Sequence, residues 1–231
     1  MTAPTNNRLN FSPLFVVITG LFVTALLTSN IIAVKLIGVA GHFLPAAIVI
    51  FPLTYIFGDV LTEVYGYRQA RMVIWLGFAC NLFMVIAFSI GQWLPPAPFW
   101  QDQKSYEAIL GSTPRILGAS FLAYLIGEFA NSVVLSRMKL LTNGKMLWTR
   151  TIGSTIVGEG LDSAVFITLA FAGVQPGDAL LGIIRDQWLV KVGYEVVATP
   201  LTYAIVGFLK RKEAIDTYDR DVSFNPIAVF K

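Results

Sequence analysis

The chain has 231 residues, of which 55% are hydrophobic and only 13% are charged. Soluble domains carry about a quarter charged residues, so this balance excludes an ordinary soluble domain and indicates a membrane-embedded protein. The formal net charge of +3 is too small and too dispersed to predict a nucleic-acid partner. The single cysteine, Cys80, excludes an intrachain disulfide and a zinc-type cluster, and neither a metal nor a cofactor is expected.

Apolar runs divide the chain into predicted membrane spans. A span needs roughly 20 mostly apolar residues, and backbone groups in lipid must be satisfied locally, which favours helices. No small-residue cleavage site follows the polar start MTAPTNNRLN, so the first run is expected to be an uncleaved span. The sequence therefore predicts an all-α membrane protein with one domain at 1–231, made of a tail at 1–12, a six-helix bundle at 13–209 and a tail at 210–231. The six spans are predicted at 13–35, 44–65, 70–94, 116–138, 150–174 and 187–209.

The distribution of basic residues predicts the orientation. With a cytoplasmic N-terminus, the inner segments hold twelve basic residues: Arg8, Arg68, Arg71, Arg137, Lys139, Lys145, Arg150, Lys210, Arg211, Lys212, Arg220 and Lys231. The outer loops hold four, at Lys35, Lys104, Arg115 and Arg185. The positive-inside rule therefore places both termini in the cytoplasm. The long outer connection, 95–115, is expected to contain a short interfacial helix or lid, and the tail after Lys212 to be an exposed extension.

Three predicted spans share a pattern in which an acid follows a glycine and a second polar side chain comes three residues later. They read GDVLTE from Gly58, GEFANS from Gly127 and GEGLDS from Gly158. A spacing of three places both polar residues on one helical face. That face is expected to point into the bundle, because a carboxylate facing lipid is costly. The pairs are Asp59 with Thr62, Glu128 with Asn131 and Glu159 with Asp162.

Other spans add polar residues at similar depth. The first contributes Asn30 and the third Asn81, while the sixth contributes Lys191 and Glu195, four apart on one face. Small residues beside the acids, such as the stripe Ala119, Ala123, Gly127 and Asn131, are also typical of simple helix packing or of a homodimer contact.

The acids outnumber the intramembrane bases. Asp59, Glu128, Glu159, Asp162 and Glu195 face Lys191 as the one obvious partner, so the excess must be protonated, hydrated or neutralised by a ligand. This favours a polar cavity for a cation or for a molecule with several N–H donors. A coupled proton is chemically compatible with it. Purely structural hydrogen bonding is the alternative, and the cluster of Glu63, Tyr65 and Arg68 fits either role.

The same stretches carry a resemblance to a known family. FPLTYIFGDVLTEVYGY, ASFLAYLIGEFANSVVLSRMK, STIVGEGLDSAVFITLAF and VKVGYEVVATPLTY, with TSN at 28–30, resemble the bacterial queuosine precursor transporters, a group also described as a vitamin uptake family. The resemblance implies six helices in the bacterial inner membrane, a fold related to the substrate-binding subunits of energy-coupling-factor vitamin importers, and a role in tRNA queuosine modification. It implies import of 7-cyano-7-deazaguanine, 7-aminomethyl-7-deazaguanine or queuine.

A carboxyl-rich cavity suits such a base, since a carboxylate can accept from its N1–H and 2-amino group together. We expect Glu128, Asn131, Glu159 and Asp162 to grip the base, with Asn30, Asp59, Lys191 and Glu195 completing the pocket or positioning its acids. Lys191 fits either an ion pair with Glu195 or Asp162 or a ligand contact. Trp188, Tyr194 and Phe129 are candidates to stack on the ring, and the glycines beside Glu159 would let a flat ring approach.

Two other functions fit less well. An intramembrane aspartyl protease is disfavoured because GEGLD separates glycine from aspartate and the matching tyrosine-aspartate pair is absent, so no enzyme is expected. A binding subunit that needs an energy-coupling partner would dock through small residues four apart in the first span, and Gly20, Thr24 and Thr28 form an imperfect stripe of this kind.

Overall fold

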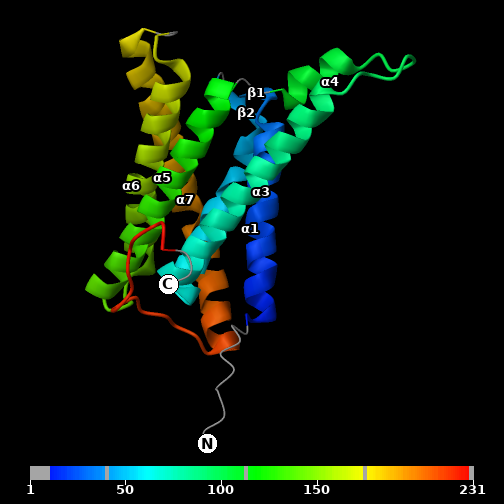
Figure 1. Cartoon of the computed structure of the whole chain (residues 1–231). Coiled ribbons are helices and arrows are strands. Elements are labelled where there is room, and N and C mark those ends of the chain that lie inside the picture. The colour runs from blue at the N-terminus through cyan, green and yellow to red at the C-terminus, as the bar shows by residue number, and fades with distance from the viewer. Residues whose placement is uncertain (1–10, 40–41, 112–113, 174–175, 229–231) are drawn as a thin grey trace, which may run out of the picture.

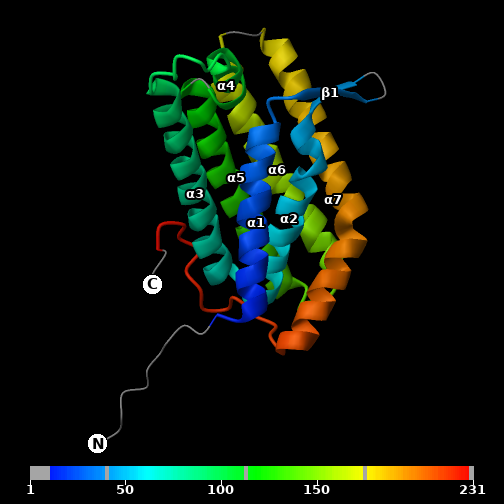
Figure 2. The same cartoon turned by 90° about the vertical axis from the view of Figure 1, so that its right-hand side faces the viewer.

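The computed structural model describes residues 11–39, 42–111, 114–173 and 176–228. Its elements run in chain order as α1 (Pro13–Ile32), β1 (Leu36–Val39), β2 (His42–Pro45), a 3-10 turn η1 (Ala46–Val49), α2 (Phe51–Val60), a π-helical turn η2 (Leu61–Tyr65), α3 (Tyr67–Trp93), α4 (Gln103–Leu110), α5 (Pro114–Leu141), α6 (Leu147–Phe171) and α7 (Gly177–Glu213). The long helices lie side by side as one bundle (Figures 1 and 2).

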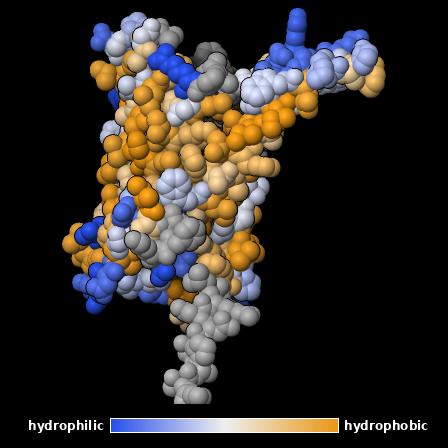
Figure 3. All heavy atoms as spheres, viewed as in Figure 1, coloured by the Kyte–Doolittle hydropathy of each residue, from blue (hydrophilic) through white to orange (hydrophobic). Residues whose placement is uncertain are grey.

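Five stretches of the described chain are long and apolar enough to cross a membrane, and they contain α1, α3, α5, α6 and α7. On the face that Figure 3 shows, outward side chains form an apolar band across the middle of the molecule, between polar ends. The protein is therefore a largely helical, multi-pass membrane protein, as its composition predicts.

The second predicted span, 44–65, is wrong in its first part. Its helix begins only at Phe51, after a 3-10 turn and a hairpin in which Leu36 of β1 pairs with Pro45 of β2. Pro45 disfavours helical conformation in the residue before it, whereas Pro52 lies in the first turn of α2, where proline is tolerated. The hairpin extends sideways from one end of the bundle (Figure 2) and is a departure from an all-α fold.

Apolar side chains from α1, α2 and η2 form the main core. Phe15, Phe22 and Leu26 of α1 pack with Val60 and Val64, and all five are at most 7% exposed. This core holds the short α2–η2 segment in the centre of the bundle, where its polar face meets α5 and α6.

Helices α5 and α6 cross in close contact at two glycines. A Cβ on Gly127 would lie 2.8 Å from the Cβ of Asp162, and a Cβ on Gly158 would lie 2.7 Å from the Cβ of Asn131. Both distances are too short for a real contact. The glycines that precede the acids therefore allow helix packing within the bundle. This is one of the two roles predicted for the small residues, the other being a homodimer contact.

Replacing Gly127 by Ala is expected to lower the free energy of unfolding by about 1–3 kcal/mol, because the added methyl group forces the two helices apart. Gly118→Ala on the same helix is the matched control, since a Cβ there meets nothing within 4 Å. Unfolding of both variants in detergent measures the difference. A Gly127→Ala protein as stable as Gly118→Ala would contradict this account of the crossing.

The segment after α7 is not an exposed extension, so that prediction is wrong. Residues 214–228, here called the C-terminal strap, fold back across the end of the bundle (Figure 1). The backbone N–H of Thr217 donates to the carbonyl of Val64 at 3.2 Å, and Arg71 donates to the carbonyls of Ser223 and Asn225 at 3.1 and 2.8 Å. Gly66, at φ +84°, leaves room for Thr217, whose methyl carbon would lie 2.7 Å from a Cβ at that position.

Asp219 of the strap binds the start of α3. Its buried carboxylate accepts from the backbone N–H of Tyr67 at 2.9 Å and from the hydroxyl of Ser136 at 2.6 Å. It thus takes the part of an N-cap for a helix that begins after a glycine, and its charge complements the helix dipole.

Asp219→Ala is expected to cost about 1–2 kcal/mol of stability, because the first turn of α3 loses its capping acceptor. Asp221→Ala removes an exposed acid two residues away and serves as the control. Thermal unfolding in detergent should separate the two variants. Equal midpoints would show that the strap does not stabilise α3.

The long connection between α3 and the next span contains the predicted short helix. α4 buries none of its residues and lies at the end of the bundle opposite the strap (Figure 1). It is attached to α3 by the hydroxyl of Tyr106, which donates to the carbonyl of Phe88 at 3.1 Å.

Candidate functional site

A row of polar side chains on α2 and η2 organises the interior. Tyr55, Asp59, Thr62 and Glu63 recur every one to four residues along one face, and each is at most 7% exposed. Each one meets a polar side chain of α5 or α6. A polar face of this kind can be buried only if its groups are paired, which explains why it lies toward the polar residues of GEFANS and GEGLDS.

Lys191 of α7 joins the two acids of α6. Its ammonium lies 2.8 Å from an oxygen of Glu159 and also donates to Asp162. The hydroxyl of Tyr55 donates to the same oxygen of Glu159 at 3.1 Å. Lys191 was predicted to pair with Asp162 or Glu195 or to contact the ligand. The structure shows it as an ion-pair partner of Asp162 and of Glu159.

Asp59 and Asn131 are joined one turn further along α2. The amide of Asn131 donates to one carboxylate oxygen of Asp59 at 2.8 Å, and both side chains are buried. The second oxygen of Asp59 and the amide oxygen of Asn131 have no hydrogen-bond partner in the described part of the chain. Glu195 interacts electrostatically with Asp59 and with Glu159, so it belongs to the same cluster.

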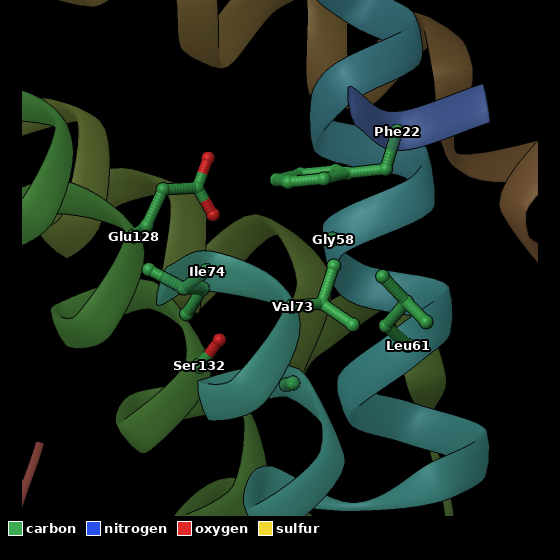
Figure 4. Close-up of a pocket in the computed structure, with 8 residues that line it drawn as sticks. Phe22, Gly58, Leu61, Val73, Ile74, Glu128 and Ser132 are labelled. Atoms are coloured by element: carbon green, nitrogen blue, oxygen red, sulfur yellow. The ribbon is translucent and has the colours of Figure 1, made fainter. Parts of the chain in front are cut away.

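Glu128 of α5 points toward Gly58 and Phe22 across a narrow pocket (Figure 4). Its carboxylate would lie 3.4 Å from a Cβ on Gly58, so a larger residue there would press on it. Its charge interacts with Glu159, Asp162 and Lys191. The pocket between Glu128 and Gly58 is too small to admit a water molecule.

Asn30, also predicted as a site residue, forms its hydrogen bond with an amide and not with one of the acids. Its amide donates to Asn81 of α3 at 3.2 Å, which ties α1 to α3. The structure thus brings Glu159, Asp162 and Lys191 into one ion-paired group, pairs Asp59 with Asn131, and places Glu128 and Glu195 within charge interaction of them. Among the described residues no group of three His, Cys, Asp or Glu side chains is arranged to hold a metal ion.

Comparison with known families gives this arrangement a context. Residues 45–205 match the family model described as "Putative vitamin uptake transporter". The match covers more than half of the chain and includes all of the acids above. The chain belongs to this family.

Two curated relatives share its sequence. A protein of Bacillus subtilis (strain 168) is 30% identical over 198 residues, which are 84% of this chain and 86% of the relative, and it is named "Probable queuosine precursor transporter". A protein of Haemophilus influenzae with the same name is 26% identical over 121 residues, or 52% of this chain and 49% of the relative. No solved structure matches the chain. The family is one of transporters, and its members place this chain in the bacterial inner membrane.

Glu63 is the centre of an ion-pair cluster for which the sequence left two roles open. It is 0% exposed, and its carboxylate receives two hydrogen bonds of 2.8 Å from Arg150 and one of 2.6 Å from Lys210. Lys139 lies 3.5 Å from the same carboxylate. Tyr65 and Arg68, which the sequence analysis grouped with Glu63, are not among the residues that contact its carboxylate here.

Asp216 of the strap extends this cluster to the surface. It lies 2.6 Å from Lys139 and 2.9 Å from Lys210. Burial alone would raise the pKa of Asp216, but the hydrogen bonds from Lys139 and Lys210 outweigh it and hold the pKa below its ordinary value. Asp216 is therefore an anion at neutral pH, and the strap is tied to α5 and α7 by charge.

Tyr55 is a member of the acid cluster that sequence reasoning missed. The signal was present, since Tyr55 lies four residues before Asp59, on the same helical face. Two of the three predicted stacking residues make other contacts: Trp188 donates to the carbonyl of Ile156 at 2.9 Å and packs over Gly160, while Phe129 contacts Trp75. Both glycines beside Glu159 are thus covered by protein in this conformation.

Proposed function

We propose that the protein imports queuosine precursors across the inner membrane and so supports tRNA queuosine modification. The observation that carries the proposal is the excess of acids in the bundle. Lys191 forms salt bridges with both Glu159 and Asp162, while Asp59, Glu128 and Glu195 form no salt bridge among the described residues. The names of the two bacterial relatives support the substrate class.

The chemistry of a 7-deazaguanine fits this acid-rich group. The base presents N1–H and a 2-amino group side by side, and a carboxylate can accept from both. We assign this role to Glu128, Asn131, Glu159 and Asp162, with Asp59, Lys191 and Glu195 positioning the acids. Asn30 would act through its hold on α3. An aminomethyl substituent would add a cation that a second carboxylate stabilises.

Binding requires the bundle to open. The pocket between Glu128, Gly58 and Phe22 is too small for a ring (Figure 4). In this account the conformation is the closed one, and a base enters when α2 and α5 separate. Opening of this kind is how transporters give alternating access to a central site.

The topology in this proposal has six crossings and cytoplasmic ends. α2 and η2 together form the sixth, short crossing beside α1. The cluster of Arg150, Lys139 and Lys210 around Glu63 lies at the end that the strap covers, and this end faces the cytoplasm by the positive-inside rule.

Uptake of a labelled 7-deazaguanine by reconstituted protein tests the proposal. Asp162→Asn and Glu128→Gln should each abolish uptake. Asp186→Asn is the matched control, because Asp186 lies on α7 in an exposed pair with Arg185. Uptake at the control level by both site variants would overturn the assignment.

A binding subunit that depends on an energy-coupling partner is the second candidate. Gly20 and Thr24 on α1 are exposed, and a Cβ on Gly20 would meet nothing within 4 Å, so this small-residue face is open to a partner helix. Uptake by vesicles that contain this chain alone would exclude a required partner.

A further inference from the structure

Glu195 is a buried acid whose carboxyl group is unpaired among the residues that the structure describes. It lies one turn after Lys191 on α7 and is 1% exposed. Neither of its carboxylate oxygens has a hydrogen-bond partner in the described part of the chain. The nearby hydroxyl of Thr199 donates to the main-chain carbonyl of Glu195 at 2.7 Å and not to its carboxylate.

The groups around Glu195 offer little to stabilise a negative charge. The titratable groups of the elements packed against this part of α7 are Tyr55 and Asp59 on α2, Glu63 on η2, and Glu159 and Asp162 on α6, with Lys191 on α7 itself. Most of them are acids. Lys191, the one base in this set, forms its ion pairs with Glu159 and Asp162.

An ionised carboxylate in this position would be costly. Removing one from water costs several kcal/mol even after relaxation, and charge repulsion from Asp59 and Glu159 adds to it. A proton on Glu195 removes both penalties. Asp59 differs in its contacts, because the amide of Asn131 donates one hydrogen bond to it at 2.8 Å, whereas the carboxyl group of Glu195 receives none among the described residues.

The neighbouring polar atoms suit a proton. The second oxygen of Asp59, which interacts with Glu195, is a buried acceptor without a donor in the described part of the chain, and a carboxylic acid brings one O–H. A metal ion would need several ligands at once, and the described residues supply no such group of acids, histidines or cysteines.

We propose that Glu195 binds the proton whose entry drives import. The proposal rests on the import function above. In the outward-open state the carboxylate of Glu195 takes one proton from outside, and the site closes over the base with Glu195 neutral. In the inward-open state the O–H bond breaks, the proton leaves to the cytoplasm and the carboxylate is restored.

Asp59 connects Glu195 electrostatically with the strap-covered end of the bundle. It lies four residues before Glu63 on the same helical face, and the two acids interact electrostatically. Glu63 is surrounded by three basic side chains at the strap-covered end. Asp59 is thus a positioning group between the proton site and that end.

Transport in vesicles under an imposed pH gradient tests the proposal, with 7-cyano-7-deazaguanine as an uncharged probe. One proton per base allows about tenfold accumulation per unit of inward pH gradient. Wild type and Asp186→Asn should approach this value. Glu195→Gln, which resembles the protonated acid, should not accumulate the base but should still exchange labelled for unlabelled base at equal pH.

Accumulation by Glu195→Gln at the wild-type level would overturn the proposal. So would wild-type accumulation that follows a sodium gradient and ignores pH. Absence of both exchange and accumulation in wild type would instead refute import of this base. In that case, infrared spectroscopy of the ligand-free wild type tests separately whether Glu195 carries a proton. A protonated-carboxyl band at neutral pH that Glu195→Gln removes supports it, and a band that persists, or no band at all, contradicts it.

Discussion

Glu63→Gln is expected to lower the free energy of unfolding by about 3–5 kcal/mol, which is the cost of breaking a buried ion pair by removing one partner. Glu63 is 0% exposed and neutralises Arg150, whose side chain is 1% exposed. Without the carboxylate, the charge of Arg150 remains buried beside Lys139 and Lys210. The cluster joins η2, α5, α6 and α7, so the whole strap-covered end should loosen.

Unfolding in detergent measures this effect. Asp186→Asn is the control, because its ion pair with Arg185 is more than two-thirds exposed and should contribute at most about 1 kcal/mol. If both substitutions changed stability equally, Glu63 would not be the centre of a structural cluster.

Lys191→Met is expected to reduce uptake about a hundredfold or more, since an unpaired buried charge costs about 3–5 kcal/mol and each 1.4 kcal/mol is a factor of ten. Lys191 is the ion-pair partner of Glu159 and Asp162. Without it, the two acids repel each other and lose the arrangement that we assign to the base.

A second variant separates stability from transport. Lys191→Met combined with Asp162→Asn removes one charge of each sign and should regain stability while uptake stays low. Lys212→Met removes an exposed base from the same helix and should leave uptake unchanged. Uptake restored in the double variant would mean that Asp162 serves only to pair Lys191.

The polar faces were predictable from local spacing. Acids three or four residues from a second polar group must share a helical face, and burial in lipid must turn that face inward, so the spacing of Glu159 and Asp162 is enough to place them together. The pairing of Lys191 with Asp162 also follows from scarcity, because Lys191 is the one obvious base at that depth.

Contacts between distant segments were not predictable. Asp219 binds Tyr67 across 152 positions, and nothing in the polar composition of the tail shows that it folds back. Glu63 was ambiguous for a similar reason, since its three basic partners come from three later helices. The late start of α2 depended on two prolines that a hydropathy window averages over.

Calorimetric titration of the purified protein with 7-deazaguanines, guanine and unrelated vitamins tests the central claim most directly. We expect saturable binding of at least one 7-deazaguanine, weakened in Asp162→Asn and Glu128→Gln but retained in Asp186→Asn. Binding of a vitamin with no response to any 7-deazaguanine would contradict it.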